Sequence, residues 1–142
     1  ITELANKRIF LPNSTEYLIL PELLSKEPLG PLVRHGDDQW RDVVSWSLKI
    51  MIIAEELNIT TQNLDEYLGS DNNEILRILG IVGSYGDMIE LEEKWAYNII
   101  KQVGNYKQVF NRNLGPDTIV NLNRGLNKLY TEGGLLYAPP FR

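Results

Sequence analysis

Residues 38–57 read DQWRDVVSWSLKIMIIAEEL, and this stretch says more about the fold than any other part of the chain. Its apolar side chains recur at steps of three and four residues, which is the spacing of one face of an α-helix. Further apolar residues widen this stripe, so we expect a long helix that is buried on more than one side. The apolar positions are Trp40, Val43, Val44, Trp46, Ile50, Met51, Ile53, Ala54 and Leu57.

The residues just before this helix predict a short strand and a turn. Residues 32–34 form a brief run typical of a strand, and Gly36 supplies turn geometry. Asp37 or Asp38 can then accept a hydrogen bond from the first free N–H groups of the helix. An acidic pair after a glycine can also bind a divalent cation, but helix capping accounts for these residues better.

The first thirty residues predict mainly extended structure. Residues 2–8 fit the tail of a helix, and residues 17–20 form an apolar run typical of a buried strand. Between residues 24 and 31, two prolines and a glycine prevent helix formation, so we expect a crossover or linker there.

The part of the chain after residue 58 predicts a series of short helices. Residues 61–68 and 72–79 each have a polar start and a glycine after the end, and residues 81–90 show no helical period. Clearer helical patterns follow at 91–103 and 106–113.

The C-terminal region predicts a last helix and an arm. The helix would begin at Pro116 and Asp117 and end at Gly133, with Ile119, Leu122, Leu126 and Leu129 on one side. Residues 135–142 are apolar with two prolines, so we expect an extended arm that packs on the rest of the chain.

Composition excludes several classes of protein. The chain has 142 residues, 43% of them apolar, which allows one compact domain or a large piece of one. Its formal net charge of −5 makes nucleic acid or an anionic membrane an unlikely principal partner. With no cysteine and one histidine, it has no thiol nucleophile or disulfide and lacks the ligands of nearly every zinc site. The chain starts with Ile1 and shows no signal peptide, so we interpret it as a fragment.

The residue groups that could carry chemistry have simpler structural explanations. Glu90, Glu92 and Glu93 lie on what we expect to be a solvated first helical turn, where carboxyl groups seldom have the shifted pKa that catalysis needs. The glycines of 80–86 do not match a phosphate-binding motif, and His35 has no partner at a motif spacing. Trp40, Trp46 and Trp95 have the spacing of helical core residues. We therefore expect no enzyme.

Three segments together resemble a known family: LPELLSKEPLGPLVRHGDDQW at 20–40, WAYNIIKQVGNY at 95–106 and GGLLYAPPFR at 133–142. Residues 111–115 and 124–127 fit the same pattern. The chain resembles the C-terminal part of the general L-amino-acid-binding periplasmic protein of polar amino-acid ABC transporters. The resemblance covers nearly the whole chain and includes its last residues.

The resemblance implies a fold class and a domain division. The fold would be α/β and helix-rich, a C-terminal fragment of a type II periplasmic-binding-protein fold with a helical extension. Residues 1–22 would be the end of the second lobe, 23–30 the hinge crossover, and 31–142 the C-terminal part of the first lobe plus the extension. Whole members of the family close two lobes around the ligand and present both to the membrane permease.

The resemblance also implies a function for the parent protein. It would be a periplasmic, non-enzymatic receptor without cofactor that delivers L-amino acids to the permease subunits of an ABC transporter. In the family, the arginine that binds the ligand carboxylate lies in the first half of the sequence. The aspartate that binds the ligand ammonium group would fall just before Ile1. Ser25, Lys26 and Glu27 lie in the hinge and could approach the cleft. This chain alone should therefore bind amino acids poorly or not at all.

Two further expectations concern assembly. A first lobe without its N-terminal strands would leave an unpaired sheet edge, which favours a homodimer or strand swapping. The alternative function is a self-standing helical interaction or oligomerisation domain derived from the same family.

Overall fold

The long helix expected at 38–57 is α2 (Asp38–Glu56), and two further α-helices and one short 3₁₀ helix pack on it. The computed structural model describes residues 2–20, 22 and 28–141. Its other α-helices and short 3₁₀ helices are α1 (Thr2–Ile9), α3 (Asn73–Ile78), α4 (Trp95–Gln102), α5 (Tyr106–Leu114), η1 (Ser14–Glu16), η2 (Leu64–Gly69), η3 (Asp87–Ile89), η4 (Gly125–Asn127) and η5 (Tyr130–Glu132).

Local sequence explains where α2 begins and which half of it is buried. The Asp37 side chain accepts a hydrogen bond of 3.2 Å from the backbone N–H of Trp40, so the predicted cap is confirmed. The buried residues of α2 all lie in its second half, whereas its first turns are exposed or half-buried. The buried residues are Ile50, Ile52, Ile53, Ala54 and Glu55.

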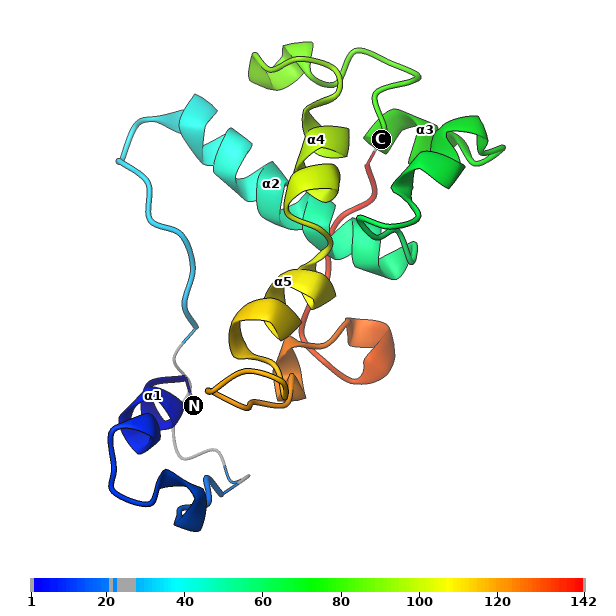
Figure 1. Ribbon diagram of the computed structural model, residues 1–142. Coiled ribbons are helices and arrows are strands. Elements are labelled where there is room, and N and C mark those ends of the chain that lie inside the picture. The colour runs from blue at the N-terminus through cyan, green and yellow to red at the C-terminus, as the bar shows by residue number, and fades with distance from the viewer. Residues whose placement is uncertain (1, 21, 23–27, 142) are drawn as a thin grey trace.

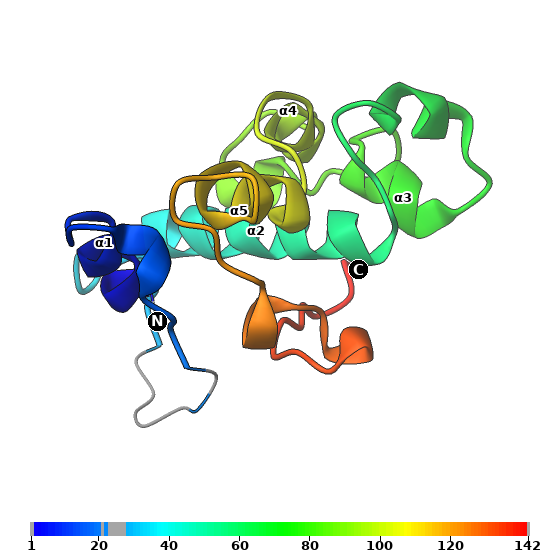
Figure 2. The ribbon, with the colours of Figure 1, turned by 60° about the horizontal axis from the view of Figure 1, so that its bottom comes forward.

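Helices α4 and α5 both pack against α2, and Figure 2 shows them on one side of it with the C-terminal segment on the other. Gly104 separates the two helices with a φ of 94°, a conformation that a residue with a Cβ rarely adopts. Its N–H donates 3.0 Å to the carbonyl of Ile100, which ends α4. The short helix α3 packs against η2 beyond the end of α2.

The main hydrophobic core lies between α2, α3, α4 and the C-terminal arm. The predicted arm is confirmed, because Ala138 and Phe141 are buried in this core. The Phe141 ring lies 5.5 Å from the Trp46 ring, 4.9 Å from Tyr85 and 6.3 Å from Trp95, measured between centroids. In Figure 1 the arm runs in red to the C-terminus beside α3.

A second, smaller cluster holds α1 against α5 and the residues after it. Its buried members are Ala5, Phe110, Val120 and Leu122. Arg8 adds a hydrogen bond of 3.2 Å from its Nη2 to the carbonyl of Val120. The N-terminal helix therefore packs apart from the main core.

The α/β part of the expected fold class is not confirmed. No β-strand occurs among residues 2–20, 22 and 28–141, which contain one isolated bridge, between Leu129 and Leu136. Residues 17–20 and 32–34, expected as strands, are extended but pair with no described segment. A strand needs a neighbour for its N–H and C=O groups, and no segment among the described residues supplies one.

The expected last helix over residues 116–133 is wrong. Asn121 and Gly125 have φ values of 49° and 50°, which break any continuous helix. The N–H of Leu122 instead donates 2.8 Å to the carbonyl of Leu114, which folds the chain back onto α5. Ile119 and Leu126, expected on the buried stripe, are exposed.

The remaining expectations hold with small changes. Helices at 2–8, 72–79, 91–103 and 106–113 are confirmed as α1, α3, α4 and α5, with α4 beginning four residues later than expected. The unit at 61–68 is the 3₁₀ helix η2, and 81–90 is a loop that contains η3. None of the described helices has the length and apolar character required to cross a membrane.

Candidate functional site

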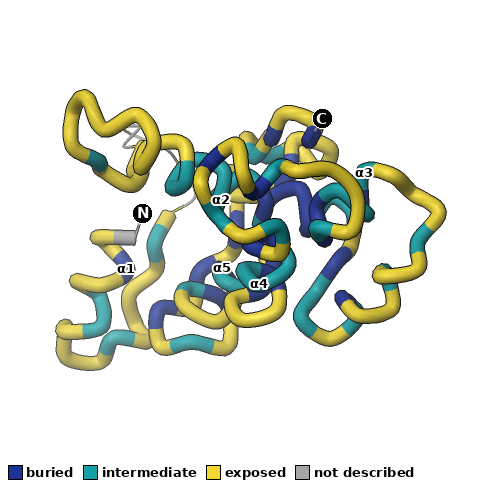
Figure 3. The backbone as a smooth tube through the Cα atoms, turned by 90° about the horizontal axis from the view of Figure 1, so that it is seen from above, coloured by how far each residue is buried: buried dark blue, intermediate teal, exposed yellow. Residues whose placement is uncertain are grey.

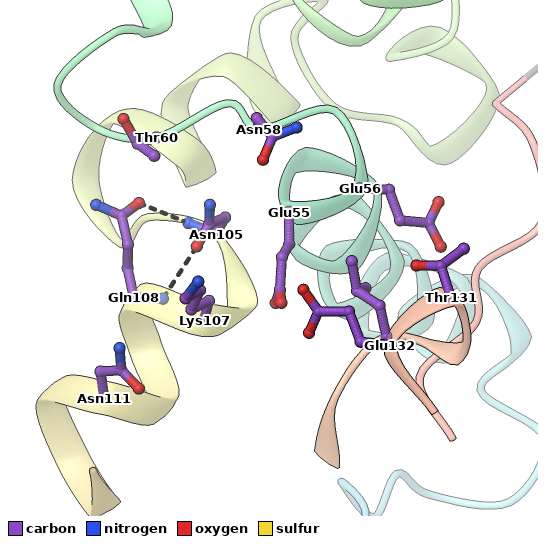
Figure 4. A pocket seen from close by; sticks show the side chains of 11 residues that line it. Glu55, Glu56, Asn58, Thr60, Asn105, Lys107, Gln108, Asn111, Thr131 and Glu132 are labelled. Atoms are coloured by element: carbon purple, nitrogen blue, oxygen red, sulfur yellow. Dashed lines mark hydrogen bonds between the residues drawn. The ribbon is translucent and has the colours of Figure 1, made fainter. Parts of the chain in front are cut away.

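A pocket of about 450 Å³ opens where the end of α2 meets the start of α5 and the η5 turn. Figure 4 shows that the side chains lining it are mostly polar. They include three carboxylates, one lysine and several amide and hydroxyl groups. The lining residues are Glu55, Glu56, Asn58, Thr60, Asn105, Lys107, Gln108, Asn111, Leu129, Thr131 and Glu132.

Glu55, one of the lining residues, belongs to a buried ion pair. Arg124 donates from Nη1 to Oε1 of Glu55 and from Nη2 to Oε2 of Glu55, the latter at 3.0 Å. The same guanidinium donates to the carbonyl of Asn127 and lies over the rings of Tyr106 and Phe110. The carboxylate of Glu55 is thus neutralised by the protein and is not free to bind a ligand.

The amides of the pocket are also engaged in the fold. Asn105 and Gln108 form a capping box at the start of α5: the backbone N–H of Gln108 donates 2.9 Å to Asn105, and that of Asn105 donates 3.1 Å to Gln108. Gln108 also joins Thr61 through two hydrogen bonds of 3.1 and 3.2 Å. Asn105 donates 2.8 Å to the carbonyl of Ile59. These contacts fix the loop after α2 onto α5.

Glu56 differs from the other polar residues of the pocket. Its Oε1 is buried and has no hydrogen-bond partner among the described residues. Burial, and then the nearby carboxylates of Glu74 and Glu55, raise the pKa of the Glu56 carboxyl. Lys107 is the cation of the lining, and no group of three or more His, Asp or Glu in the described residues could hold a metal ion.

A second polar cluster joins η2 to α4 on the surface. Asp65 accepts 2.6 Å from the ammonium group of Lys101 and 2.7 Å from the hydroxyl of Tyr97. The hydrogen bond from Lys101, followed by that from Tyr97, lowers the pKa of Asp65. The bond to Asp65 raises the pKa of both Tyr97 and Lys101. All three side chains are already paired, so this cluster serves to fix η2.

The hinge residues expected near a ligand, Ser25, Lys26 and Glu27, lie outside the described residues. Their role stays a prediction. The same holds for the domain boundary at 23–30, most of which falls on residues outside those described.

The other sequence candidates take structural roles. Glu93 accepts hydrogen bonds from the N–H groups of Gly86 and Asp87, and Glu92 accepts from Asn98, so these carboxylates hold the loop before α4. His35 is exposed. Of the tryptophans, Trp95 is buried and Trp46 packs on the core, whereas Trp40, expected in the core, is exposed.

Sequence reasoning missed Glu55, Arg124 and the Asn105–Gln108 pair. The last pair has a readable signal, since Asn followed three residues later by Gln after a helix-ending glycine is a capping-box pattern. Glu55 also carries a signal, because it lies within the apolar stripe of α2. Nothing in the local sequence of Arg124 indicates its partner, which is 69 residues away.

The chain is similar over nearly its whole length to known transport proteins. It is 51% identical over 140 residues to the glutamate/glutamine/aspartate/asparagine-binding protein BztA of Rhodobacter capsulatus, covering 98% of this chain and 41% of BztA. It is 50% identical over 137 residues to the general L-amino acid-binding periplasmic protein AapJ of Rhizobium johnstonii, covering 95% of this chain and 40% of AapJ. The chain thus spans about 40% of the length of the curated relatives it matches. No family model matches it.

A solved structure has the same fold. It is an ABC transporter periplasmic binding protein from Brucella ovis with glutathione bound, 42% identical to this chain with a TM-score of 0.92. The match covers 99% of this chain and 44% of the other. Together these similarities confirm the resemblance predicted from residues 20–40, 95–106 and 133–142.

Proposed function

Because the chain is homologous to part of the binding proteins of amino-acid ABC transporters, we propose that it is part of a periplasmic receptor that binds L-amino acids and delivers them to a membrane permease. The observation that carries this proposal is the identity of about one half to BztA and AapJ along 95–98% of the chain. The matched relatives are named as binding proteins, so we propose no catalytic activity and no cofactor.

The names of the similar proteins also suggest a ligand class. BztA is named for glutamate, glutamine, aspartate and asparagine, and the Brucella ovis protein holds glutathione. All five molecules carry a free α-ammonium group and a free α-carboxylate on one carbon. We therefore propose a ligand of this kind, which a receptor recognises by paired opposite charges.

In this proposal the described residues form the framework of the receptor rather than its ligand site. The pocket at the end of α2 offers little to an α-amino acid, because Glu55 is paired with Arg124 and the amides of Asn105 and Gln108 hold the capping box. Ser25, Lys26 and Glu27 remain the proposed hinge residues that approach the cleft, and no ligand contact is assigned to them. A hinge of this type lets two lobes close around a ligand.

The test uses a chimera of AapJ in which this chain replaces the region that it matches. Isothermal titration calorimetry with glutamate, glutamine, aspartate, asparagine and glutathione should show binding to the chimera with a Kd in the micromolar range or tighter. The 142-residue chain alone should bind none of them, since it lacks the remaining length of the relatives. A chimera that melts cooperatively but binds none of the five would contradict the proposed function.

A different outcome would favour the alternative, a self-standing interaction domain. Light scattering coupled to size exclusion measures the mass of the isolated chain in solution. The same measurement on intact AapJ is the control, because it gives the oligomeric state of a whole receptor. A stable oligomer of the isolated chain, together with a chimera that binds no ligand, would support the alternative.

A further inference from the structure

A further pocket, of about 350 Å³, lies where the end of α1 meets the segment after α5. Its lining comes from α1, from η1 and from the segment 118–121. Figure 3 shows α1 at the edge of the molecule, with most of its backbone exposed or half-buried. This pocket shares no lining residue with the pocket at the end of α2.

The charge of this lining is opposite to that of the other pocket. Among the described residues that line it, Arg8 alone is charged, whereas three carboxylates and one lysine line the pocket at the end of α2. Glu16 and Asp117 are close in sequence to lining residues but do not line the pocket themselves. The chain's net charge of −5 has little effect here, because charges beyond about 8 Å are screened at physiological ionic strength. The lining therefore favours an anion.

Arg8 keeps most of its N–H donors for a ligand. Its Nη2 donates to the carbonyl of Val120 over 3.2 Å, which fixes the guanidinium group, and it forms no salt bridge with a described residue. The end of α1 does not require it either, since the carbonyls of Lys7 and Arg8 accept from the backbone N–H groups of Phe10 and Leu11. A guanidinium group held in this way can bind a carboxylate or phosphate through two parallel hydrogen bonds.

Further donors come from the other two segments of the lining. The hydroxyl groups of Ser14 and Thr15 and the side-chain amide of Asn121 have no hydrogen-bond partner among the described residues. Thr118 instead shapes the turn, because its hydroxyl donates 2.8 Å to the carbonyl of Gly115 and accepts 3.3 Å from the N–H of Asn121. Donors from three segments suit the three acceptor oxygens of a phosphate ester better than the two oxygens of a carboxylate.

The pocket also has an apolar side, which Ile9 and Ile119 form. Its volume of about 350 Å³ exceeds what a phosphate group alone fills, since one water occupies about 30 Å³ of liquid. A site with apolar walls and a few polar groups is typical of small organic ligands.

We propose that this pocket binds a phosphate group carried by a small organic molecule. The guanidinium group of Arg8 would bind two of the phosphate oxygens, and the hydroxyl and amide groups from η1 and 118–121 would bind the others. The organic part would lie against Ile9 and Ile119. This site is separate from the amino-acid site of the proposed receptor and does not depend on it.

Nuclear magnetic resonance of the 142-residue chain tests the proposal, with propyl phosphate and inorganic phosphate as probes and sodium chloride of equal ionic strength as the reference. The amides of Ser14 and Thr15 and the side-chain amide of Asn121 should shift saturably, with a Kd in the millimolar range or tighter. The tighter binder of the two probes identifies the source of the phosphate. Shifts that are absent, or that acetate produces at the same concentration, would overturn the proposal.

Arg8→Met should weaken the binding of propyl phosphate at least about tenfold, because it removes hydrogen bonds between charged groups. Lys7→Met is the matched control: it removes the same charge from the same turn of α1, but Lys7 pairs with Glu3 and does not line the pocket. Equal loss of affinity in both variants would show an unspecific charge effect and overturn the proposal. If Arg8→Met unfolds α1, Ser14→Ala takes its place, because Ser14 lies outside the second hydrophobic cluster, and should weaken binding severalfold.

Hydrogen exchange measures whether the ligand joins α1 to the segment 118–121. At propyl phosphate about tenfold above Kd, the amides of α1 should exchange about tenfold more slowly than in sodium chloride, because the ligand binds only the closed form. Amides of residues 52–54 in α2 serve as the internal reference. Unchanged exchange in α1 would overturn the location of the site.

The AapJ chimera shows whether a chain of full receptor length keeps the site. Propyl phosphate should slow the exchange of α1 in the chimera as well. No effect there would mean that the rest of the receptor covers the pocket, and would overturn the proposal for the receptor. A chimera that shows the effect but binds none of the amino acids would leave this inference standing and contradict the proposed function alone.

Discussion

At the scale of single residues, the contact between Glu55 and Arg124 joins parts of the chain that are 69 residues apart. It fastens the irregular segment after α5 to the end of α2. Both side chains are buried, so the desolvation of the two charges is offset only while the pair is intact. Removal of one partner leaves a buried charge without compensation.

Arg124→Met should therefore lower the free energy of unfolding by about 3–5 kcal/mol. Urea unfolding followed by circular dichroism measures this change. Arg41→Met is the control, because its pair with Asp38 is exposed and should contribute less than about 1 kcal/mol. The double variant Glu55→Met, Arg124→Met should recover much of the loss. A single Arg124→Met variant as stable as Arg41→Met would contradict this view of the pair.

Glu56 predicts a dependence of stability on pH. Its pKa is raised in the folded chain above the ordinary value of 4.5, so the folded state binds this proton more tightly than the unfolded state. The contribution of Glu56 to the free energy of unfolding is fully present below pH 4.5. This contribution is lost as the pH rises through the higher pKa of the folded state. Glu56→Gln should therefore raise the free energy of unfolding at neutral pH and not below pH 4.5. Glu66→Gln is the matched control, because Glu66 is exposed on η2.

At the scale of elements, the C-terminal arm closes the core that the helices leave open. Helices α2 and α4 present Trp46 and Trp95 toward a space that Phe141 fills. The arm itself has little regular structure, so its position depends on this burial and on the bridge between Leu129 and Leu136. A short irregular segment thus completes the packing of the longest helix.

Phe141→Ala should lower the free energy of unfolding by about 3–5 kcal/mol, because it removes a buried aromatic side chain and leaves a cavity. Chemical denaturation and the near-ultraviolet circular dichroism of the tryptophans measure the effect. Leu135→Ala in the same arm is exposed and should change stability by less than about 0.5 kcal/mol. Equal effects of the two substitutions would show that the arm does not belong to the core.

At the scale of the whole molecule, the stability comes from two separate hydrophobic clusters of unequal size. The main core includes residues from α2, α3, α4 and the arm, whereas the cluster under α1 has four buried members. Local opening requires the loss of few contacts where a cluster is small. The N-terminal helix should therefore open independently of the rest.

Native-state hydrogen exchange should show this difference. The amides of α1 should exchange with a free energy of opening well below that of the amides of residues 52–54 in α2, and the latter should follow global unfolding. Leu122→Ala should speed exchange in α1 and leave that in α2 nearly unchanged. Identical opening energies in α1 and α2 would contradict the division into two clusters.

Local sequence patterns were sufficient to predict the α-helices up to residue 114 and the family, but not the structure after α5. The apolar spacing, the Asp37 cap and the glycine stops placed α2, α3, α4 and α5, because a helix satisfies its backbone hydrogen bonds internally and its signals lie within a few residues. The family followed from three motifs in order. The buried arm was also predictable, since two prolines exclude both helix and central strand.

Features that depend on contacts between distant parts of the chain could not be predicted from local sequence. The turn at Asn121 that replaced a helix over 116–133, and the partner of Arg124, arise from contacts with α5 and α2. The segments 17–20 and 32–34 have strand-like sequence but are unpaired among the described residues. The physical reason is that a strand, unlike a helix, is completed by hydrogen bonds from another part of a chain, which no local pattern can specify.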